Sequence, residues 1–180
     1  MKRRNRAEVA VVILRTPIGR LGVAATARGL CRVEFDAKGI RAARGSAAAR
    51  AHLKKAVQQL REYFAGARKE FDVPLDLRGT QHQVRVWRAL EEIPFGRTRT
   101  YGDVARKLGL PVAAARAVGR ACATNPVAVV LPCHRVLGGD GGLHGFGGGL
   151  WRKRALLELE NSEYIRQGVL FKDNMKGWKN

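Results

Sequence analysis

The first third of the chain consists of short apolar segments separated by turns. Segments Val9–Leu14, Leu21–Ala25 and Leu30–Phe35 are rich in aliphatic side chains. Turn-forming residues separate them, at Pro17-Ile18-Gly19 and at Arg28-Gly29. Short apolar runs joined by tight turns are typical of β-hairpins. The pattern therefore predicts three antiparallel strands.

A helical pattern follows these strands. Apolar residues recur at i, i+4, i+7 and i+11, which places them on one face of a helix: Leu53, Val57, Leu60 and Phe64. Ser46 is a suitable amino-terminal cap, and Gly66 is a suitable end. We therefore predict a small α/β amino-terminal domain over residues 1–72 and a linker at residues 73–79.

Three short helices are predicted after the linker. Thr80 and Gln83 have the spacing of a capping box at the start of the first helix. The second helix begins at Thr100 and ends at Gly109, and the third spans residues 112–124. Two short helices joined by a glycine-containing turn form the helix-turn-helix pattern, whose second helix enters a DNA groove. An ordinary pair of antiparallel helices is the alternative that this pattern leaves open.

The chain then passes through an apolar segment into a glycine-rich loop. The run Val127–Leu131 is predicted to be a buried strand, and it leads into Pro132-Cys133-His134-Arg135. Eight glycines crowd residues 138–149, and Leu150–Glu160 is predicted to be the last amphipathic helix. Residues 163–180 are predicted to be a polar tail.

Together these elements define an α+β fold. A small amino-terminal three-stranded antiparallel sheet with one helix precedes a mostly helical, winged-helix-like helix-turn-helix domain at residues 80–162. The hydrophobic fraction of 46% is that of a globular protein and argues against disorder.

Charge indicates the class of partner. The 34 Lys and Arg residues exceed the 15 Asp and Glu residues, which gives a net charge of +19. A surplus of this size favours a polyanion through long-range attraction and counterion release. Net charge does not distinguish DNA from RNA or from an anionic membrane surface. The helix-turn-helix pattern, with Arg116 and Arg120 on its second helix, favours DNA.

The cysteines and the amino terminus indicate the compartment. Cys31, Cys122 and Cys133 are widely spaced and form no CxxC pair, so neither a disulfide framework nor a metal site is predicted. The basic start resembles a signal peptide, but Glu8 and Arg15 interrupt its apolar run. No stretch is long enough to span a membrane. We expect a cytoplasmic monomer, associated with the nucleoid through DNA, that needs no cofactor.

Cys133 differs from the other two cysteines in its surroundings. It follows an apolar run and a proline, and it precedes His134, Arg135 and the glycine-rich loop. A neighbouring histidine and positive charge lower the pKa of a thiol and increase its nucleophilicity. Adjacent residues on a strand point to opposite faces, so His134 reaches the sulfur only at a turn or through a water. These residues leave a reactive thiol and a buried structural cysteine equally open.

The segment NPVAVVLPCHRV, from Asn125 to Val136, resembles the active-site signature of the O6-alkylguanine-DNA alkyltransferases. Three further segments fall in the family's order and spacing: GTQHQVRVWRALEEIPFGRTRTYGDVA at residues 79–105, ARAVGRACATNP at 115–126 and LWRKRALLELE at 150–160. Together they cover about half of the chain. The resemblance implies single-turnover transfer of an alkyl group from O6-alkylguanine, or from O4-alkylthymine, in double-stranded DNA to a cysteine.

The resemblance also implies a role for individual residues. Cys133 matches the alkyl acceptor, His134 the base that takes its proton through a water, and Glu160 the carboxylate that orients this histidine. Asn125 matches the asparagine that ties the active-site turn to the helix-turn-helix. Tyr101 matches the tyrosine that helps to rotate the nucleotide and donates a proton or hydrogen bond to the leaving guanine.

Further residues match positions that contact DNA or the flipped base. Arg116 matches the arginine that fills the gap left in the duplex, and in the family its helix lies in the minor groove. The other implied DNA contacts are Thr100, Arg120 and Arg135. The implied base pocket comprises Val136, Phe146 and Gly147.

The chain departs from the family pattern at two places. His82 stands where bacterial members usually have an aromatic residue, and Phe146-Gly147-Gly148-Gly149 replaces the Arg-Trp or serine of many members. The range of accepted alkyl groups is therefore open. Three alternatives stay open: a protein that recognises alkylated bases without repairing them, a transcription factor with an incidental thiol, and a Cys/His hydrolase.

Overall fold

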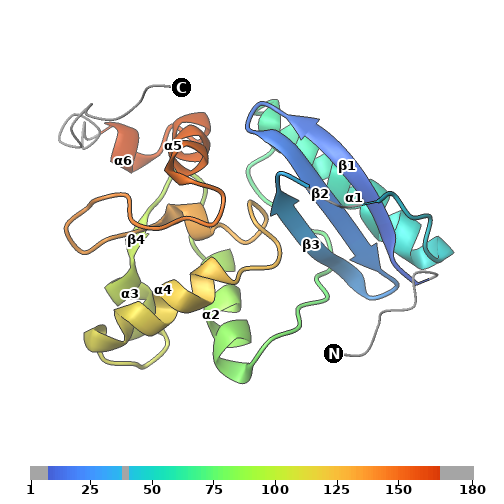
Figure 1. The fold of residues 1–180 in the computed structure, drawn as a ribbon. Coiled ribbons are helices and arrows are strands. Elements are labelled where there is room, and N and C mark those ends of the chain that lie inside the picture. Colours follow the sequence, from blue (N-terminus) through green and yellow to red (C-terminus); the bar gives the residue numbers. More distant parts are fainter. Residues whose placement is uncertain (1–7, 38–40, 167–180) are drawn as a thin grey trace.

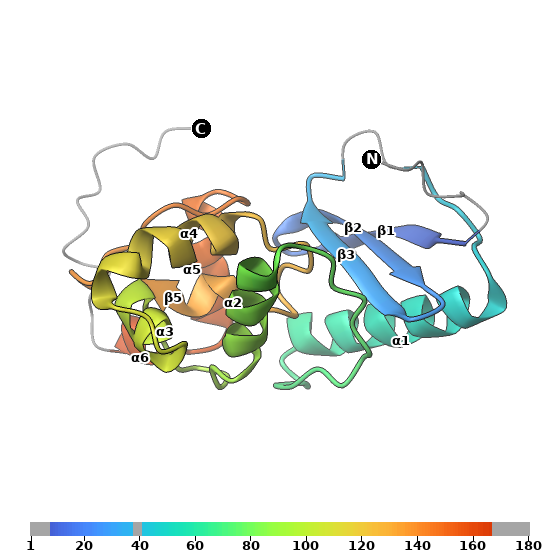
Figure 2. The ribbon, with the colours of Figure 1, turned by 90° about the horizontal axis from the view of Figure 1, so that it is seen from below.

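The structure is a computed structural model that describes residues 8–37 and 41–166. Its amino-terminal part is an antiparallel sheet in the order β1-β2-β3, with one long helix on one face (Figures 1 and 2). The bounds are β1 Ala10–Thr16, β2 Gly19–Thr26, β3 Gly29–Phe35 and α1 Ala47–Phe64. The predicted strands and helix are confirmed, including Ser46 as the cap of α1.

The carboxyl-terminal part is mostly helical. Its elements are α2 Gln81–Glu91, β4 Arg99–Thr100, α3 Tyr101–Lys107, α4 Ala115–Ala123, β5 Val136–Leu137, α5 Leu150–Leu159 and α6 Glu163–Arg166. Both predicted helix starts are capping boxes, Thr80 with Gln83 and Thr100 with Asp103. The helices α3 and α4 pack together as the predicted helix-turn-helix, and the short strands β4 and β5 pair in parallel.

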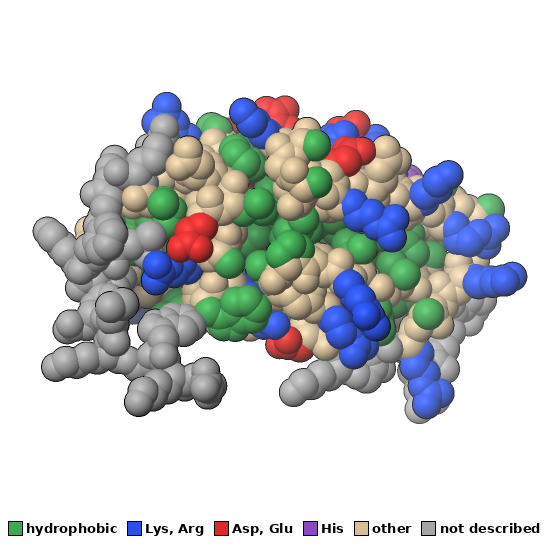
Figure 3. Space-filling view, turned by 90° about the horizontal axis from the view of Figure 1, so that it is seen from above, with side chains coloured by type: hydrophobic (Ala, Val, Ile, Leu, Met, Phe, Trp, Pro, Cys, Tyr) green, Lys and Arg blue, Asp and Glu red, His purple; other side chains and the backbone are tan. Residues whose placement is uncertain are grey.

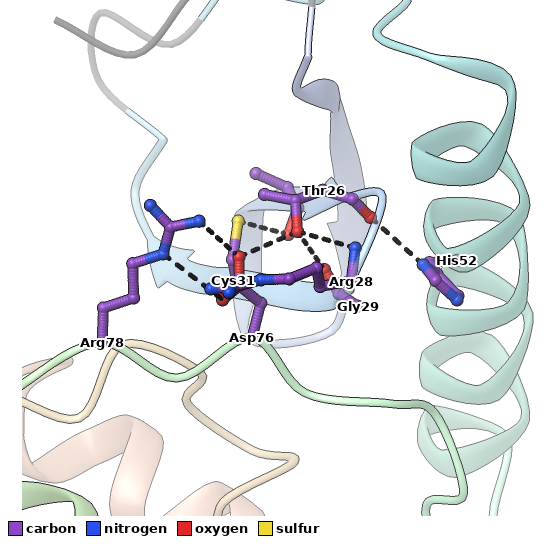
Figure 4. Close-up of polar contacts among 8 residues, drawn as sticks. Thr26, Arg28, Gly29, Cys31, His52, Asp76 and Arg78 are labelled. Carbon is purple, nitrogen blue, oxygen red and sulfur yellow. Dashed lines mark hydrogen bonds and ion pairs between the residues drawn. The ribbon is translucent and has the colours of Figure 1, made fainter.

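The segment between the two parts lies along β3. The amide of Leu30 donates to the Pro74 carbonyl at 2.7 Å, and the amide of Asp76 donates to the Leu30 carbonyl at 2.8 Å. Figure 4 shows the buried Asp76 carboxylate among Thr26 and the guanidinium groups of Arg28 and Arg78. Burial raises the pKa of Asp76, but these hydrogen bonds outweigh it and lower the pKa to about 2. The predicted linker is therefore fastened to the sheet.

Two predictions of local structure are wrong. Residues Val127–Leu131 are buried but do not form a strand: Val127 bridges β3 at Val33, and Val129 has a φ of 72°. The run folds back on itself, and the Leu131 amide donates to the Val127 carbonyl at 2.9 Å. The tail was predicted to begin at residue 163, but residues Glu163–Arg166 form α6, and its buried Tyr164 packs against Leu137 and Leu157. The remainder of the tail lies outside the described residues.

The charge surplus is visible at the surface. In the space-filling view of Figure 3, basic side chains outnumber acidic ones, and many lie over the half formed by the sheet and α1. No helix within the described ranges is both long and apolar enough to cross a bilayer.

Candidate active site

The local chain direction at Cys133 is set by a tight turn. Residues Cys133–Arg135 form one 3-10 turn, in which the Arg135 amide donates to the Pro132 carbonyl at 2.9 Å. Cys133 and His134 therefore lie on a turn and not on a regular strand. The turn sits between the Val127–Leu131 segment and β5, in the interior of the carboxyl-terminal part.

The Cys133 thiol is almost fully buried, with 6% of the residue exposed. The Asn125 amide lies 3.1 Å from its sulfur and also donates to the Leu131 carbonyl at 2.8 Å. Burial raises the pKa of the Cys133 thiol, while the hydrogen bond from Asn125 and the charge of Lys153 oppose this shift. The resting thiol is therefore neutral and needs a base before it can act as a nucleophile.

His134, the next residue in the chain, is a candidate for that base. It is fully buried, and its Nε2 lies 2.8 Å from Oε1 of Glu160. Burial lowers the pKa of His134, so the imidazole is neutral at rest. A neutral ring that donates from Nε2 to the carboxylate has its lone pair on Nδ1. Nδ1 makes no hydrogen bond with any described residue, and it is therefore free to accept a proton.

Glu160 joins the histidine to distant parts of the chain. Its carboxylate accepts hydrogen bonds from Tyr63 Oη at 2.7 Å and from the Gly96 amide at 3.1 Å. It also forms an ion pair with Arg135, whose Nη2 lies 2.8 Å from Oε1. Burial raises the pKa of Glu160, but His134 and Arg135 outweigh it and hold the pKa well below its ordinary value. The carboxylate is therefore charged and fixed from several sides.

Two predicted contact residues lie in the interior instead. Arg135 is 5% exposed and donates to Glu160 and to the Ile93 carbonyl, so the prediction that it contacts DNA is wrong. Arg135 points inward because its guanidinium is the ion-pair partner of the buried Glu160 carboxylate. Val136 is fully buried in β5 and pairs with Arg99, and it is not among the residues that line the cavity described next.

An open cavity of about 880 Å³ lies between the helix-turn-helix and the glycine-rich loop. Five of the predicted site residues line it: Thr100, Tyr101, Arg116, Phe146 and Gly147. Burial and the two nearby thiols, Cys122 and Cys133, raise the pKa of Tyr101 to about 12, so this phenol stays protonated. Arg120 is exposed on α4 but does not line the cavity.

Lys153 is a site residue that sequence reasoning missed. Its ammonium is buried and donates to the carbonyls of Val136 at 2.7 Å and His144 at 3.0 Å. Burial lowers its pKa to about 8, while the two cysteines raise it. Lys153 is the middle one of three consecutive basic residues on α5, so only the inward phase of the helix distinguishes it.

Comparison with protein families places both parts of the chain. Residues 81–162 match the family described as 6-O-methylguanine DNA methyltransferase, DNA binding domain. Residues 11–77 match the ribonuclease-like domain of 6-O-methylguanine DNA methyltransferase. The amino-terminal match includes the segment along β3 and ends at residue 77, and the carboxyl-terminal match begins at residue 81.

Individual relatives agree with these matches. A methylated-DNA–protein-cysteine methyltransferase from Mycobacterium bovis is 62% identical over 116 residues, which cover 64% of this chain and 70% of the relative. The protein of the same name from Methanosarcina acetivorans is 45% identical over 83% of this chain and 97% of its own length. The crystal structure of Mycobacterium tuberculosis O6-methylguanine methyltransferase has a TM-score of 0.73 at 45% identity and covers 91% of this chain and 99% of its own. A complex of the M. tuberculosis protein with DNA has the same TM-score at 46% identity, with 84% of this chain and 92% of its own covered.

Proposed function

The chain belongs to the methylated-DNA–protein-cysteine methyltransferase family, enzymes of DNA repair, and from this premise we propose that Cys133 accepts the alkyl group from O6-alkylguanine in double-stranded DNA. One observation carries the proposal. A buried cysteine, followed by a histidine that a buried carboxylate holds, lies close to Tyr101, which lines a cavity in a helix-turn-helix. The candidate nucleophile and the candidate base are thus adjacent in the chain, and a buried carboxylate holds the base.

The first step is removal of the thiol proton. Because the pKa of the buried Cys133 thiol is raised, a base must act before attack. Nδ1 of His134 takes this proton through a water, and the Glu160 carboxylate stabilises the resulting imidazolium. The Asn125 amide and the Lys153 ammonium stabilise the thiolate.

The second step is displacement at the alkyl carbon. The thiolate forms the new S–C bond as the bond between this carbon and O6 breaks, and the electron pair stays on the guanine. Tyr101, whose raised pKa keeps it protonated, donates a proton or hydrogen bond to the departing base. In-line displacement requires the sulfur, the carbon and the leaving oxygen to be aligned, so the flipped base must be held in one orientation beside Cys133.

The reaction requires the damaged nucleotide outside the base stack. A stacked base does not present its O6 substituent to a protein thiol, so the nucleotide is rotated into the cavity. Arg116 is exposed beside the cavity, and we assign it to the gap left in the duplex. Thr100 and Arg120 are assigned to the DNA backbone, and Phe146 and Gly147 to the base pocket.

The product limits each molecule to one reaction. Regenerating the thiol would require a nucleophile to break the S–C bond of a neutral thioether with a thiolate as the leaving group, and a thioether resists this, so the thiol is not regenerated. We propose that the protein acts as a monomer, with residues 80–162 as its DNA-binding domain and residues 1–72 as its amino-terminal domain. The same proposal includes its location in the cytoplasm, on the DNA of the nucleoid. The mass-spectrometric assay described next, with a duplex carrying O4-alkylthymine, measures whether this base is also a substrate.

Mass spectrometry on the reacted protein tests this proposal. The protein is incubated with duplex DNA carrying O6-methylguanine and digested, and the mass of the peptide containing Cys133 is determined. We expect one methyl group in place of the thiol proton, saturation at one per protein, and no gain in Cys133→Ala. Tight binding without any gain of mass would favour a protein that only recognises the lesion. Sustained turnover beyond one methyl per molecule would contradict the single-use mechanism.

A further inference from the structure

The amino-terminal sheet touches the wall of the proposed alkyl cavity. The ring of Phe35, at the end of β3, lies 5.5 Å from the ring of Phe146, centroid to centroid, at an interplanar angle of 59°. Phe146 lines the cavity on the glycine-rich loop. A Cβ atom on Gly148 would lie 2.5 Å from Phe35 Cδ2 and 3.0 Å from Phe146 Cε1. The loop backbone is therefore seated directly on the Phe35 ring, and only glycine allows this approach.

Arg152 on α5 fixes the same arrangement. Its guanidinium donates to the carbonyl of Gly148 at 2.8 Å and to that of Ile18, in the β1–β2 turn, at 2.8 Å. It also pairs with the Asp36 carboxylate and lies over the Phe35 ring, with 5.2 Å from Cζ to the ring centroid. Arg152 is 8% exposed, so its charge is largely withdrawn from water and held by these groups. One side chain therefore ties the loop, the hairpin turn and the end of β3 together.

The backbone at the end of β3 is strained at this point. Asp36 and Ala37 have φ values of 65° and 41°, in the left-handed region that non-glycine residues rarely adopt. This conformation ends the strand and accompanies the pairing of the Asp36 carboxylate with Arg152. Such a conformation persists where surrounding contacts enforce it. The strained backbone therefore lies at the point where Arg152 connects the end of β3 to the loop at Gly148.

We propose that the amino-terminal domain determines the size of alkyl group that the protein accepts, with Phe35 as a positioning residue for Phe146. The inference rests on the proposed function, because it concerns the substrate range of the same cavity. Phe35 does not itself line the cavity. It prevents Phe146 and the loop at Gly148 from retreating toward the sheet, and so limits the space beside the flipped base.

The test compares two alkyl groups in one variant. Rates of alkyl transfer to Cys133 are measured by mass spectrometry for duplexes carrying O6-methylguanine or O6-benzylguanine. In Phe35→Ala, Phe146 gains room to move outward, and we expect the benzyl-to-methyl rate ratio to rise by about threefold or more, a change typical of altered apolar pockets. Equal changes in both rates, or an unchanged ratio, would overturn the inference.

A matched variant separates selectivity from stability. Val12 belongs to β1 and lines a groove with residues of α1, away from the loop, so Val12→Ala weakens the same domain without reaching the cavity wall. It is expected to leave the rate ratio unchanged. If Phe35→Ala does not fold, Phe35→Leu keeps an apolar side chain and the same expected direction. A ratio that rises equally in Val12→Ala would attribute the effect to general loosening and refute the positioning role.

A double substitution gives an independent measure. Gly148→Ala places a methyl group against the Phe35 ring, so it is expected to displace the loop and slow both transfers. Phe35→Ala removes the opposing ring atoms and is expected to restore at least part of the rate. If Phe35→Ala does not restore any of the rate lost in Gly148→Ala, contact between Phe35 and the loop at Gly148 does not position the loop. If the parent protein does not alkylate Cys133 from either duplex, the proposed function itself fails. If the parent reacts but the ratio and the rescue are absent, only this inference fails.

Discussion

Replacement of Glu160 by glutamine tests the buried network behind the proposed base. The change removes one charge and preserves the shape of the side chain. In the native protein the carboxylate accepts from Tyr63, Gly96, His134 and Arg135, and it is 2% exposed. A glutamine has one acceptor oxygen, and its NH₂ group would face donors where an acceptor is needed.

The expected loss of stability is large because the buried Arg135 guanidinium keeps its charge but loses its anionic partner. Arg135 is 5% exposed, and its partner would be gone. Removing one member of a buried ion pair costs about 3–5 kcal/mol, since the other charge is left uncompensated. This is a substantial part of the roughly 5–15 kcal/mol that stabilises a typical domain. Alkyl transfer is expected to slow as well, because His134 loses the anion that stabilises its protonated form.

Urea denaturation followed by fluorescence measures the free energy of unfolding. The matched control is Glu158→Gln on the same helix: Glu158 is exposed and pairs with Arg154, so the expected loss is under about 1 kcal/mol. Tyr63→Phe removes a single donor to the carboxylate and is expected to cost about 1–3 kcal/mol.

A second substitution identifies the cause. Arg135→Met in the Glu160→Gln background removes the uncompensated charge, so it is expected to recover part of the lost stability. If Glu160→Gln costs no more than Glu158→Gln, the reasoning that the buried carboxylate holds this network together is wrong. If Arg135→Met lowers the stability further, the loss does not arise from the stranded guanidinium.

Three further predictions concern pH, reactivity and DNA. Asp76→Asn is expected to lower the free energy of unfolding by about 2 kcal/mol at pH 7, because the pKa of Asp76 is lowered from 3.8 to about 2 and each unit is worth about 1.4 kcal/mol. That stabilisation is present above pH 4 or so and is lost as the pH falls through about 2, so denaturation curves of the two proteins should converge there. Lys153→Met removes a cation near the thiolate, so the midpoint of the pH–rate profile of alkylation is expected to rise; a profile that matches the parent would contradict this electrostatic role. Arg116→Ala is expected to slow repair of duplex DNA more than repair of the same lesion in single-stranded DNA, whereas Arg120→Ala should lower the slope of log K against log salt by about 1 without that strand preference.

Local signals predicted the secondary structure well. Capping residues such as Ser46 and Thr80 act within one helical turn, so their effect is readable from neighbouring residues. The apolar run Val127–Leu131 was misassigned because a buried segment of this length has no periodicity that separates a strand from a folded-back loop. Its conformation depends on contact with β3, which lies about a hundred residues earlier.

The site shows a similar division. The adjacency of Cys133 and His134 is written in the sequence, and the resemblance to a family supplied Glu160. No local pattern connects Tyr63 with Glu160, which are 97 residues apart. Likewise, nothing in the sequence separates the buried Arg135 from the exposed Arg120, because both are single arginines beside apolar residues. Burial arises from packing between distant segments, so these assignments needed the structure.

The neutral resting state of the Cys133 thiol has a consequence for its chemical lifetime. Oxidation by peroxide proceeds through the thiolate, so a thiol that is buried and protonated reacts slowly with such oxidants. A protein that uses its cysteine once, as proposed, has no means to replace one lost to sulfinic or sulfonic acid. Burial therefore protects the acceptor during the interval between synthesis and the encounter with damaged DNA. The same burial that raises the pKa of the Cys133 thiol is therefore expected to slow its loss under oxidative stress.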